Sequence, residues 1–255
     1  MKRRDFITAT ALAAAFGLAG KPVYNVLASK DALASKTGKR LAMVIDLKKF
    51  EGNSEMMNKC VDACHSMHNV PDIEGAKEEV KWIWPEPFEH AFLEQNNQFI
   101  PENIQNNPIL IMCNHCDNPP CVGVCPPKAT WKRAEDGVVM MDWHRCIGCR
   151  YCMAACPYGS RSFNWRDPRP KIKNITANFP TRSKGVVEKC TFCDERIVKG
   201  LEPACVVASK MYEPEAMVFG DLNDDKSNIR KILSENYSIR RKPELSTQPE
   251  VYYLI

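Results

Sequence analysis

Short apolar segments, separated by polar and turn-forming residues, mark the secondary structure that this sequence predicts. Residues 41–47 form an apolar run with a single Asp, which predicts a buried strand. Residues 80–84 alternate between apolar and polar positions, and this alternation predicts a second strand that ends at Pro85 and Pro87. Residues 88–92 follow directly and predict a short helix.

A hairpin is predicted in the middle of the chain, because residues 129–133 and 138–142 flank the sequence Ala-Glu-Asp-Gly. The Asp-Gly pair at 136–137 is typical of a tight turn between two strands. Residues 95–107, in contrast, are rich in Asn and Gln and predict a surface loop. The last residues, 248–255, are largely apolar, which indicates a tail that docks on the protein.

Eight of the thirteen cysteines fall in two runs that each end in Cys-Pro: Cys113, Cys116, Cys121, Cys125 and Cys146, Cys149, Cys152, Cys156. The second run has the spacing C-x2-C-x2-C-x3-C-P that binds 4Fe-4S clusters, in which three close thiolates hold one cluster and the fourth reaches its neighbour. The first run has two extra residues in its middle gap. We therefore predict a two-cluster unit in which Cys113, Cys116 and Cys121 act with Cys156, and Cys146, Cys149 and Cys152 act with Cys125.

This spacing has a chemical reason. Three cysteines placed close together make the backbone curl around one cluster, so that amide N–H groups point at its sulfurs. The proline then turns the chain away, because it fixes φ and offers no N–H. Zinc and disulfides are the alternatives, but four close cysteines followed by Pro fit one zinc site poorly, and an odd number in this spacing is a poor disulfide framework.

The N-terminus predicts export. Arg3 and Arg4 precede an uncharged run of 15 residues, 6–20, which indicates a twin-arginine signal peptide over residues 1–34. This run is shorter than the roughly 17 to 25 residues of a membrane-spanning helix, and an Ala-Leu-Ala cleavage motif ends at Ala34. An amphipathic helix is the alternative. The signal predicts a protein exported after folding to the periplasmic or extracytoplasmic face of the cytoplasmic membrane.

Composition narrows the function further. Hydrophobic residues make up 44% and charged residues 26% of the chain, which is ordinary for a globular protein. The net charge is +4, and residues 1–34 contribute +3 of it, so a nucleic-acid partner is not predicted. The sequence shows no Ser-His-Asp arrangement, phosphate loop or paired carboxylates. We therefore predict no catalytic residue and no small-molecule substrate for this chain.

Basic residues and histidines near the cysteines have two interpretations. The region after Pro157 carries seven basic residues: Arg161, Arg166, Arg169, Lys171, Lys173, Arg182 and Lys184. Such a run is ordinarily a solvated surface; alternatively, some of these cations offset the negative charge of the clusters or face a partner. Four histidines lie close to cysteines: His65, His68, His115 and His144. We expect them to pack or to donate hydrogen bonds, with cluster ligation as the alternative.

A last cysteine set carries a family resemblance. Cys190 and Cys193 form a C-x2-C pair and Cys205 follows, but Ser209 and Lys210 stand where a ferredoxin run would place Cys and Pro. The segments C-N-H-C-D-N-P-P-C, K-C-T-F-C, G-L-E-P-A-C and P-E-V-Y-Y-L resemble the four-cluster ferredoxin-type iron-sulfur subunits of polysulfide, dimethyl sulfoxide and nitrite reductases. The segment C-H-S-M-H-N-V-P at 64–71 and the export signal are similar to subunits of the membrane complexes of dissimilatory sulfite reduction and of heterodisulfide-reductase-like menaquinol oxidation.

The resemblance implies four ligand runs, in which the first and fourth runs share their clusters. Carried onto this chain, Cys64 joins the set of Cys190, Cys193 and Cys205. The other shared cluster would need Cys60 together with positions near Phe50 or Ser54, Met57 and Ser209. Phe cannot ligate iron, and Met and Ser are poor substitutes for thiolates. We therefore expect three 4Fe-4S clusters and a buried free thiol at Cys60, with Cys60 in place of Cys64 as the alternative.

The resemblance also implies the fold and the function. The fold is predicted to be α+β, with duplicated ferredoxin-like units built from short strands, hairpins and single helical turns. The expected segments are 35–112 with the degenerate first run, 113–157 as the two-cluster unit, and 158–255 pairing with residues 41–71, with insertions at 69–107 and 158–189. The function is electron transfer in a membrane-bound, menaquinone-linked complex of sulfate and sulfite metabolism. Its expected partners are a polytopic quinone-binding subunit and a multihaem cytochrome c; a polysulfide or dimethyl sulfoxide reductase-type molybdoenzyme is the alternative.

Overall fold

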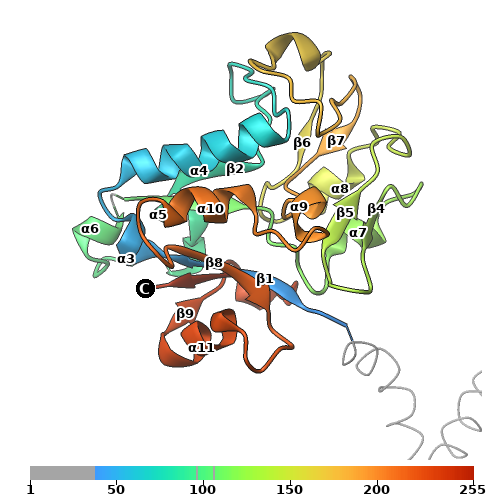
Figure 1. The fold of residues 1–255 in the computed structure, drawn as a ribbon. Helices are drawn as coiled ribbons and strands as arrows, with labels where there is room; N and C mark the ends of the chain where they lie inside the picture. The colour runs from blue at the N-terminus through green and yellow to red at the C-terminus, as the bar shows by residue number, and fades with distance from the viewer. Residues whose placement is uncertain (1–37, 96, 106) are drawn as a thin grey trace, which may run out of the picture. The chain divides into compact units, whose positions relative to one another are not determined.

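The computed structural model describes residues 38–95, 97–105 and 107–255, and the predicted signal at residues 1–34 lies outside them. Residues Lys39–Ile255 form one compact unit (Figure 1). Helices and strands follow one another in mixed order, which confirms the α+β class, whereas the duplication and the segment boundaries stay predictions. Among the described residues, no helix has the length and apolarity needed to cross a membrane.

The strands and helices are short apart from α4. The strands are β1 Leu41–Asp46, β2 Ile83–Pro87, β3 Pro108–Met112, β4 Thr130–Lys132, β5 Val139–Met141, β6 Ser162–Phe163, β7 Val187–Glu188, β8 Met217–Asp221, β9 Ser238–Ile239 and β10 Val251–Leu254. The α-helices are α3 Leu47–Phe50, α4 Ser54–Met67, α5 Phe88–Ala91, α6 Glu102–Gln105, α7 Pro120–Gly123, α8 Tyr151–Ala154, α9 Asp194–Ile197, α10 Ala204–Lys210 and α11 Asn228–Glu235. Three 3-10 helices span Leu93–Gln95, Arg169–Lys171 and Pro243–Leu245.

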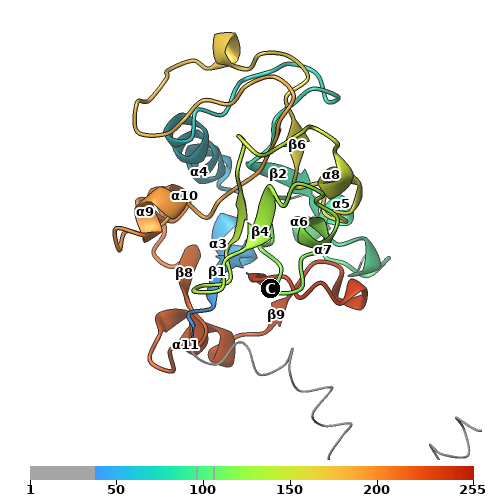
Figure 2. The same cartoon turned by 90° about the vertical axis from the view of Figure 1, so that its right-hand side faces the viewer.

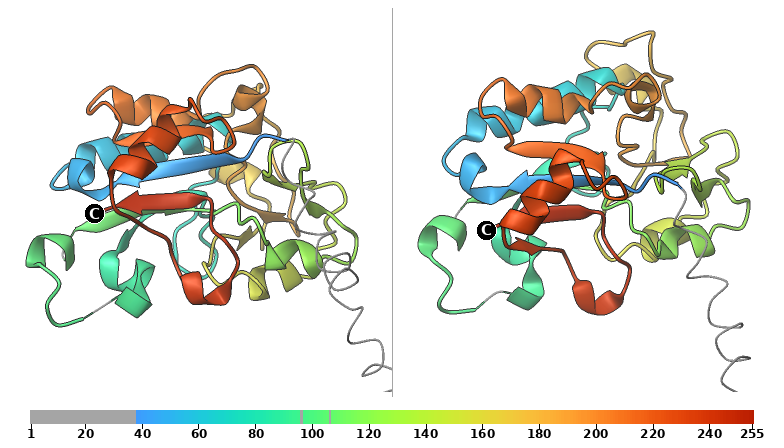
Figure 3. Two further views of the ribbon diagram at one scale, coloured as in Figure 1. Left: turned by 90° about the horizontal axis from the view of Figure 1, so that it is seen from below. Right: turned by 60° about the horizontal axis from the view of Figure 1, so that its bottom comes forward.

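The central feature is a four-stranded sheet in the order β8-β1-β10-β9. Strand β1 pairs antiparallel with β8 and parallel with β10, so that Met43 lies between Phe219 and Val251. Figure 3 shows β1 in blue directly beside the red strands from the end of the chain. This pairing confirms the buried strand predicted over residues 41–47 and the docked tail predicted over residues 248–255.

The two faces of this sheet pack against different helices. Successive side chains of a strand point to opposite faces, so Ala42 and Val44 contact the small core with α11, while Met43 and Ile45 enter the main core. Helix α11 packs on β8 and β1 (Figure 3), and α4 and α10 lie side by side over the other face (Figure 1). The main core is therefore bounded by the sheet on one side and by the α4–α10 pair on the other.

The sequence analysis missed helix α4, which has 14 residues where only single helical turns were expected. The Asn53 side chain caps the helix by accepting a hydrogen bond from the Met56 N–H at 2.9 Å. The buried residues Met56, Met57, Cys60 and Cys64 recur at helical spacing. Both signals are present in the sequence, but residues 50–64 were interpreted as a degenerate ligand run.

The strand predicted over residues 80–84 begins and ends later than expected, because β2 spans Ile83–Pro87 and includes both prolines that were expected to end it. Strand β2 pairs only with β3, in a two-stranded sheet. Each strand of such a sheet has a free edge, and proline is tolerated where no ladder hydrogen bond is needed. The short helix after it, α5, is confirmed, and the predicted loop at 95–107 contains the helical turn α6.

The predicted hairpin is confirmed. Strands β4 and β5 pair antiparallel from Thr130 opposite Met141 to Lys132 opposite Val139, and Gly137 in the turn has a φ of 77°. The helices α7 and α8, which carry cysteines of the two runs, pack against each other, and α7 also packs on β4 (Figure 2). The hairpin therefore supports the cysteine-rich part of the chain.

Gly148 is the tightest point between this region and the segment around β6 and β7. Its φ is +70°, and an added Cβ would collide with the backbone oxygen of Gly185. Gly200 has a similar φ of +72°, but an added Cβ there would meet nothing within 4 Å. Substitution of Gly200 therefore tests backbone strain alone, whereas substitution of Gly148 tests backbone strain together with steric crowding.

We expect Gly148→Ala to destabilise the protein more than Gly200→Ala does. Both variants incur the strain of a left-handed backbone, but only Gly148→Ala also forces backbone atoms apart, which costs about 2 kcal/mol more. The corresponding difference in Tm is roughly 4 to 8 °C for a domain of this size. Thermal unfolding followed by circular dichroism measures it, and equal Tm values for the two variants would contradict this account of the contact.

Candidate functional site

The first predicted ligand set surrounds one cavity beside β3, α7 and α8. Cys113 directly follows β3, Cys121 lies in α7, and Cys156 follows α8. The residues that line the cavity include all four members of this set, Cys113, Cys116, Cys121 and Cys156. None of them forms a disulfide. Burial, with a further contribution from the neighbouring thiol of Cys113, raises the pKa of Cys116 to about 12.

The second set lies next to the first and nearer to the surface. Its members are Cys125, Cys146, Cys149 and Cys152, of which only Cys152 is buried. Cys125 and Cys146 border the same small core as Cys121 and Cys152. Burial raises the pKa of the Cys152 thiol, Arg161 opposes this rise, and the thiols of Cys121 and Cys146 add to it. These contacts place the second set against the Cys121 side of the first.

The third set comes from segments far apart in the sequence. Its members are Cys64 on α4, Cys190, Cys193 at the start of α9, and Cys205 on α10. All four are buried. Burial raises the pKa of the Cys64 thiol well above its usual value, and the other three thiols of the set raise it further. The structure therefore brings Cys64 together with Cys190, Cys193 and Cys205.

Backbone N–H groups point at the sulfurs of this third set. Phe192 and Cys193 both adopt left-handed conformations, with φ values of 56° and 57°. The N–H of Phe192 lies 3.4 Å from the Cys190 Sγ, and the N–H of Ala204 lies 3.3 Å from the Cys193 Sγ. Such donors stabilise negative charge on sulfur. This curled backbone is the conformation expected around a thiolate-bound cluster.

Cys60 and the degenerate positions of the first and fourth runs lie inside packed protein. Cys60 is fully buried, and its thiol lies 3.5 Å from the carbonyl oxygen of Cys205. Phe50 and Met57 belong to the same hydrophobic core. Ser209 is also fully buried, and its hydroxyl donates to the Val206 carbonyl of its own helix at 2.9 Å. The side chains at these four positions are therefore buried in packed protein, and Cys60 and Ser209 contact backbone carbonyls of α10.

Two buried cations lie beside the cysteines. The Arg161 guanidinium donates to the Cys121 Sγ at 3.0 Å and to the Thr130 hydroxyl at 2.9 Å. Lys189 is fully buried, and its ammonium donates to the Cys190 carbonyl at 2.7 Å and to the Val139 carbonyl. Sequence reasoning missed Lys189, although its position directly before Cys190 could have indicated a role. Arg161 fits the alternative interpretation, in which a cation offsets charge at the cysteines.

Arg182 is also buried, so the solvated surface expected for the basic region is wrong for Arg161 and Arg182. Arg182 forms an ion pair with Glu188 at 2.6 Å, and both side chains are fully buried. The Trp82 indole donates to the same carboxylate at 2.8 Å. This third buried cation joins the segment before β2 to the segment around β7, and its partner is a carboxylate.

The four histidines differ in their surroundings. His68 donates from Nδ1 to the Cys64 carbonyl at 2.7 Å, and its Nε2 lies 3.0 Å from a carboxylate oxygen of Glu195. His115 is fully buried and accepts a hydrogen bond from the Val139 N–H at 3.1 Å. Burial lowers the pKa of His65, and His144 is exposed. The contacts of His68 and His115 match the expected packing and hydrogen bonding.

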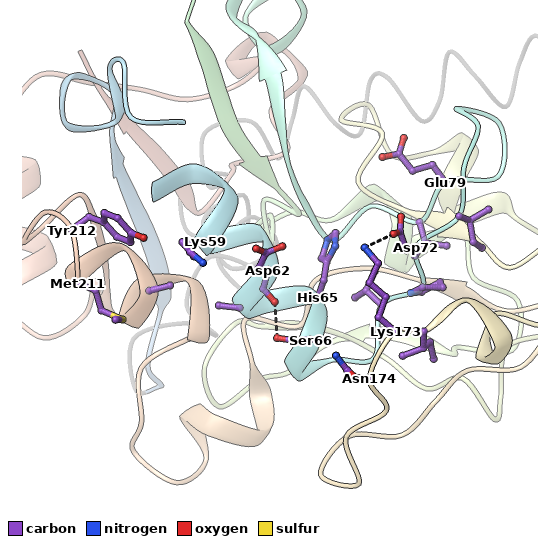
Figure 4. Close-up of a pocket in the computed structure, with 17 residues that line it drawn as sticks. Lys59, Asp62, His65, Ser66, Asp72, Glu79, Lys173, Asn174, Met211 and Tyr212 are labelled. Carbon is purple, nitrogen blue, oxygen red and sulfur yellow. Dashed lines mark hydrogen bonds and ion pairs between the residues drawn. The ribbon is translucent and has the colours of Figure 1, made fainter. Parts of the chain in front are cut away.

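A larger pocket of about 700 Å³ lies along the outer side of α4 (Figure 4). Its lining includes Lys59, Asp62 and His65 of α4, but none of the cysteines. The Asp72 carboxylate and the Lys173 ammonium form an ion pair of 2.7 Å at one end, as Figure 4 shows. Acidic and basic side chains thus both line this pocket, and no cysteine is among its lining residues.

The donor sets fit iron-sulfur clusters. Each contains four thiols, and N–H or guanidinium donors are directed at several sulfurs. Atoms of His68, Cys193 and Glu195 that could bind a metal ion lie within 4.8 Å of one another, but this group shares Cys193 with the third set. Zinc takes one closed set of four ligands, whereas here two sets adjoin across α7 and α8. A 4Fe-4S cluster supplies one-electron transfer at a potential that the protein tunes.

Comparison with known proteins supports this chemistry. Residues 109–172 match the family described as a 4Fe-4S dicluster domain. The sequence is 39% identical to the Hdr-like menaquinol oxidoreductase iron-sulfur subunit 1 of Archaeoglobus fulgidus, over 99% of this chain and 97% of that protein. It is 34% identical to the iron-sulfur cluster-binding subunit of menaquinone reductase of Nitratidesulfovibrio vulgaris, over 83% of this chain and 87% of that protein.

A component of the polysulfide reductase of Wolinella succinogenes is 40% identical over 55% of this chain and 63% of that protein. The relatives are iron-sulfur electron-transfer subunits of oxidoreductase complexes, and two of them are named for menaquinol or menaquinone. The resemblance drawn from the cysteine motifs is confirmed. This chain is a member of the family of ferredoxin-type iron-sulfur subunits of menaquinol-linked, polysulfide and dimethyl sulfoxide oxidoreductases.

Proposed function

We propose that this chain is an electron-transfer subunit that holds three 4Fe-4S clusters and has no substrate site of its own. The observation that carries the proposal is the proximity of cysteines from separate segments: Cys113, Cys116, Cys121 and Cys156 line one cavity, and Cys64 lies near Cys190, Cys193 and Cys205. The first set surrounds a cavity, the second adjoins it at Cys121, and the third joins α4 to α9 and α10. Four thiols in each set match the ligand requirement of one cluster.

The proposed number of clusters rests on the packing of the fourth site. Met57 and Ser209 are buried in contact with core residues, and the Ser209 hydroxyl already has a backbone acceptor. The other positions of the cluster site to which Cys60 would belong hold no cysteine. Cys64, in contrast, lies among the thiols of the third set. These contacts support Cys64 as the twelfth ligand and Cys60 as a free thiol.

The proposed setting is a membrane-bound respiratory complex linked to menaquinone and active in sulfate or sulfite metabolism. Two relatives are named for menaquinol or menaquinone. We propose a polytopic quinone-binding membrane subunit and a multihaem cytochrome c as partners. The twin arginine at positions 3 and 4 supports export to the extracytoplasmic face of the membrane.

The surface over the second set suits contact with a redox partner. Ile147 directly follows Cys146, and Tyr151 directly precedes Cys152. Their exposed fractions are 67% and 59%, respectively. Arg150 of the second run is exposed, as is Lys128, which follows Cys125 by three residues. Exposed apolar and aromatic residues with cations nearby in the sequence favour a partner with an acidic surface, because opposite charge speeds encounter and aromatic side chains anchor the contact. We propose that electrons enter or leave through this surface.

The first prediction concerns metal content. Anaerobically purified protein is expected to contain about twelve iron and twelve acid-labile sulfide atoms per chain, because each 4Fe-4S cluster contributes about four of each. Chemical analysis of both, with electron paramagnetic resonance of the reduced protein, measures this content. A content near sixteen would contradict the packed fourth site, and a colourless protein with zinc would contradict the function itself.

The second prediction separates Cys64 from Cys60. Cys64→Ser removes a ligand of the third set and is expected to lower the content to about eight irons per chain. Cys60→Ser is the matched control, since it makes the same chemical change one helical turn earlier on α4. It should leave the iron content and the spectrum of the reduced protein unchanged. Loss of iron from Cys60→Ser alone would reverse the two assignments.

A further inference from the structure

Arg161 lies between the first and second cysteine sets. Its side chain is 4% exposed, and it donates to the Cys121 Sγ of the first set at 3.0 Å. The same guanidinium lies 3.8 Å from the Met141 sulfur. Burial raises the pKa of the Cys152 thiol in the second set, and Arg161 opposes this rise by its charge and a hydrogen bond. The Thr130 hydroxyl on β4 holds it in place. One fixed positive charge therefore faces two ligand sets.

Lys189 occupies the corresponding position between the first and third sets. It directly precedes Cys190, and its ammonium donates to the Cys190 carbonyl at 2.7 Å and to the Val139 carbonyl of β5. Burial lowers the pKa of Lys189, while the nearby thiols of Cys113 and Cys190 oppose this change. Burial and the Cys113 thiol both raise the pKa of Cys190. Lys189 is thus a buried amine that is hydrogen-bonded to two backbone carbonyls and lies near one cysteine of each set.

A buried cation changes the ease of reduction of a nearby cluster. Reduction adds one negative charge, and the attraction between that charge and a cation is stronger inside the protein than in water. Charge, hydrogen bonds to sulfur and burial are the factors by which a protein sets cluster potentials. A cation placed between two sets therefore favours reduction at both. Arg161 contacts the first set directly at Cys121, and the Lys189 ammonium lies close enough to Cys113 of that set to interact with it electrostatically.

We propose that Arg161 and Lys189 raise the reduction potentials at the junctions between the three cysteine sets, so that the cluster held by Cys113, Cys116, Cys121 and Cys156 is reduced first. This inference rests on the proposed function, because it requires a cluster in each set. It places the cluster of the first set in the middle of the electron-transfer path, between the cluster of the second set near the surface and the cluster of the third set beside α4. Arg161 and Lys189 are positioning residues that act on the clusters through charge.

The test is a redox titration of the anaerobically purified full-length protein, followed by electron paramagnetic resonance. Lys189→Met should lower the reduction potentials of the clusters at the first and third sets by at least about 59 mV, a tenfold change in the equilibrium constant for one-electron reduction. It should leave the potential at the second set unchanged. Arg161→Met should lower the potentials at the first and second sets and leave the potential at the third set unchanged. The Cys64→Ser variant, which lacks the third set, identifies the signals.

Charge-retaining variants separate charge from packing. Lys189→Arg should keep potentials close to those of the unaltered protein, whereas Lys189→Gln, which keeps a donor but loses the charge, should behave like Lys189→Met. Lys231→Met on α11 is the matched control, because it removes an exposed charge far from any cysteine in the sequence and should shift nothing. If Lys189→Met loses iron, Lys189→Gln and the Arg161 variants supply the same comparison.

The outcomes of this test are distinct. Unchanged potentials in variants with full iron content would overturn the inference and leave the proposed function standing. Equal shifts at all three sets in one variant would also overturn it, because they would indicate a general structural effect. Absence of clusters from the unaltered protein would overturn the proposed function itself.

Discussion

The burial of cysteine thiols in sets of four is the constraint on which the rest of this structure depends. Burial raises the pKa of Cys116 and Cys190 to about 12, so without a metal these groups would stay protonated in the interior. A metal cluster requires thiolates, and its binding therefore supplies free energy to the fold that holds them. The helices α7 and α8 have only four residues each, so cluster binding at their cysteines would add to the stability of this region.

The proposed absence of a fourth cluster directs attention to the packing around Cys60, Met57 and Ser209. A cluster that is lost leaves a cavity, and an unfilled cavity destabilises a protein in proportion to its volume. Here Met56 and Met57 extend from α4 into the core toward which α10 also packs, and Ser209 satisfies its hydroxyl within its own helix. Methionine suits this role because its flexible side chain fills irregular space. Under the proposed count of three clusters, the hydrophobic contact between α4 and α10 fills this part of the core.

The features that could be predicted from the sequence are local ones. Cysteine spacing, the Asp136-Gly137 turn and the apolar run at 41–47 each report on a few neighbouring residues. The hairpin and the strand are found in the structure, and the four cysteines of the first predicted set line one cavity. Helix α4 also had a local signal, which the interpretation of its cysteines obscured. The contacts of Arg161 and Lys189 could not be predicted, because they depend on how β4 and β5 lie against residues far away in the sequence.

The parallel pairing of β1 with β10 has a consequence for biosynthesis. The strand that completes the middle of the central sheet consists of residues 251–254, at the end of the described chain. During translation these residues leave the ribosome after all the other strands of the sheet, so the sheet can close only when synthesis of this region is finished. Pairing between such distant segments is slow, because the loop entropy is lost before the contacts form. The nascent chain therefore spends a period with its cysteines accessible, in the compartment where it is made and before the core shields them.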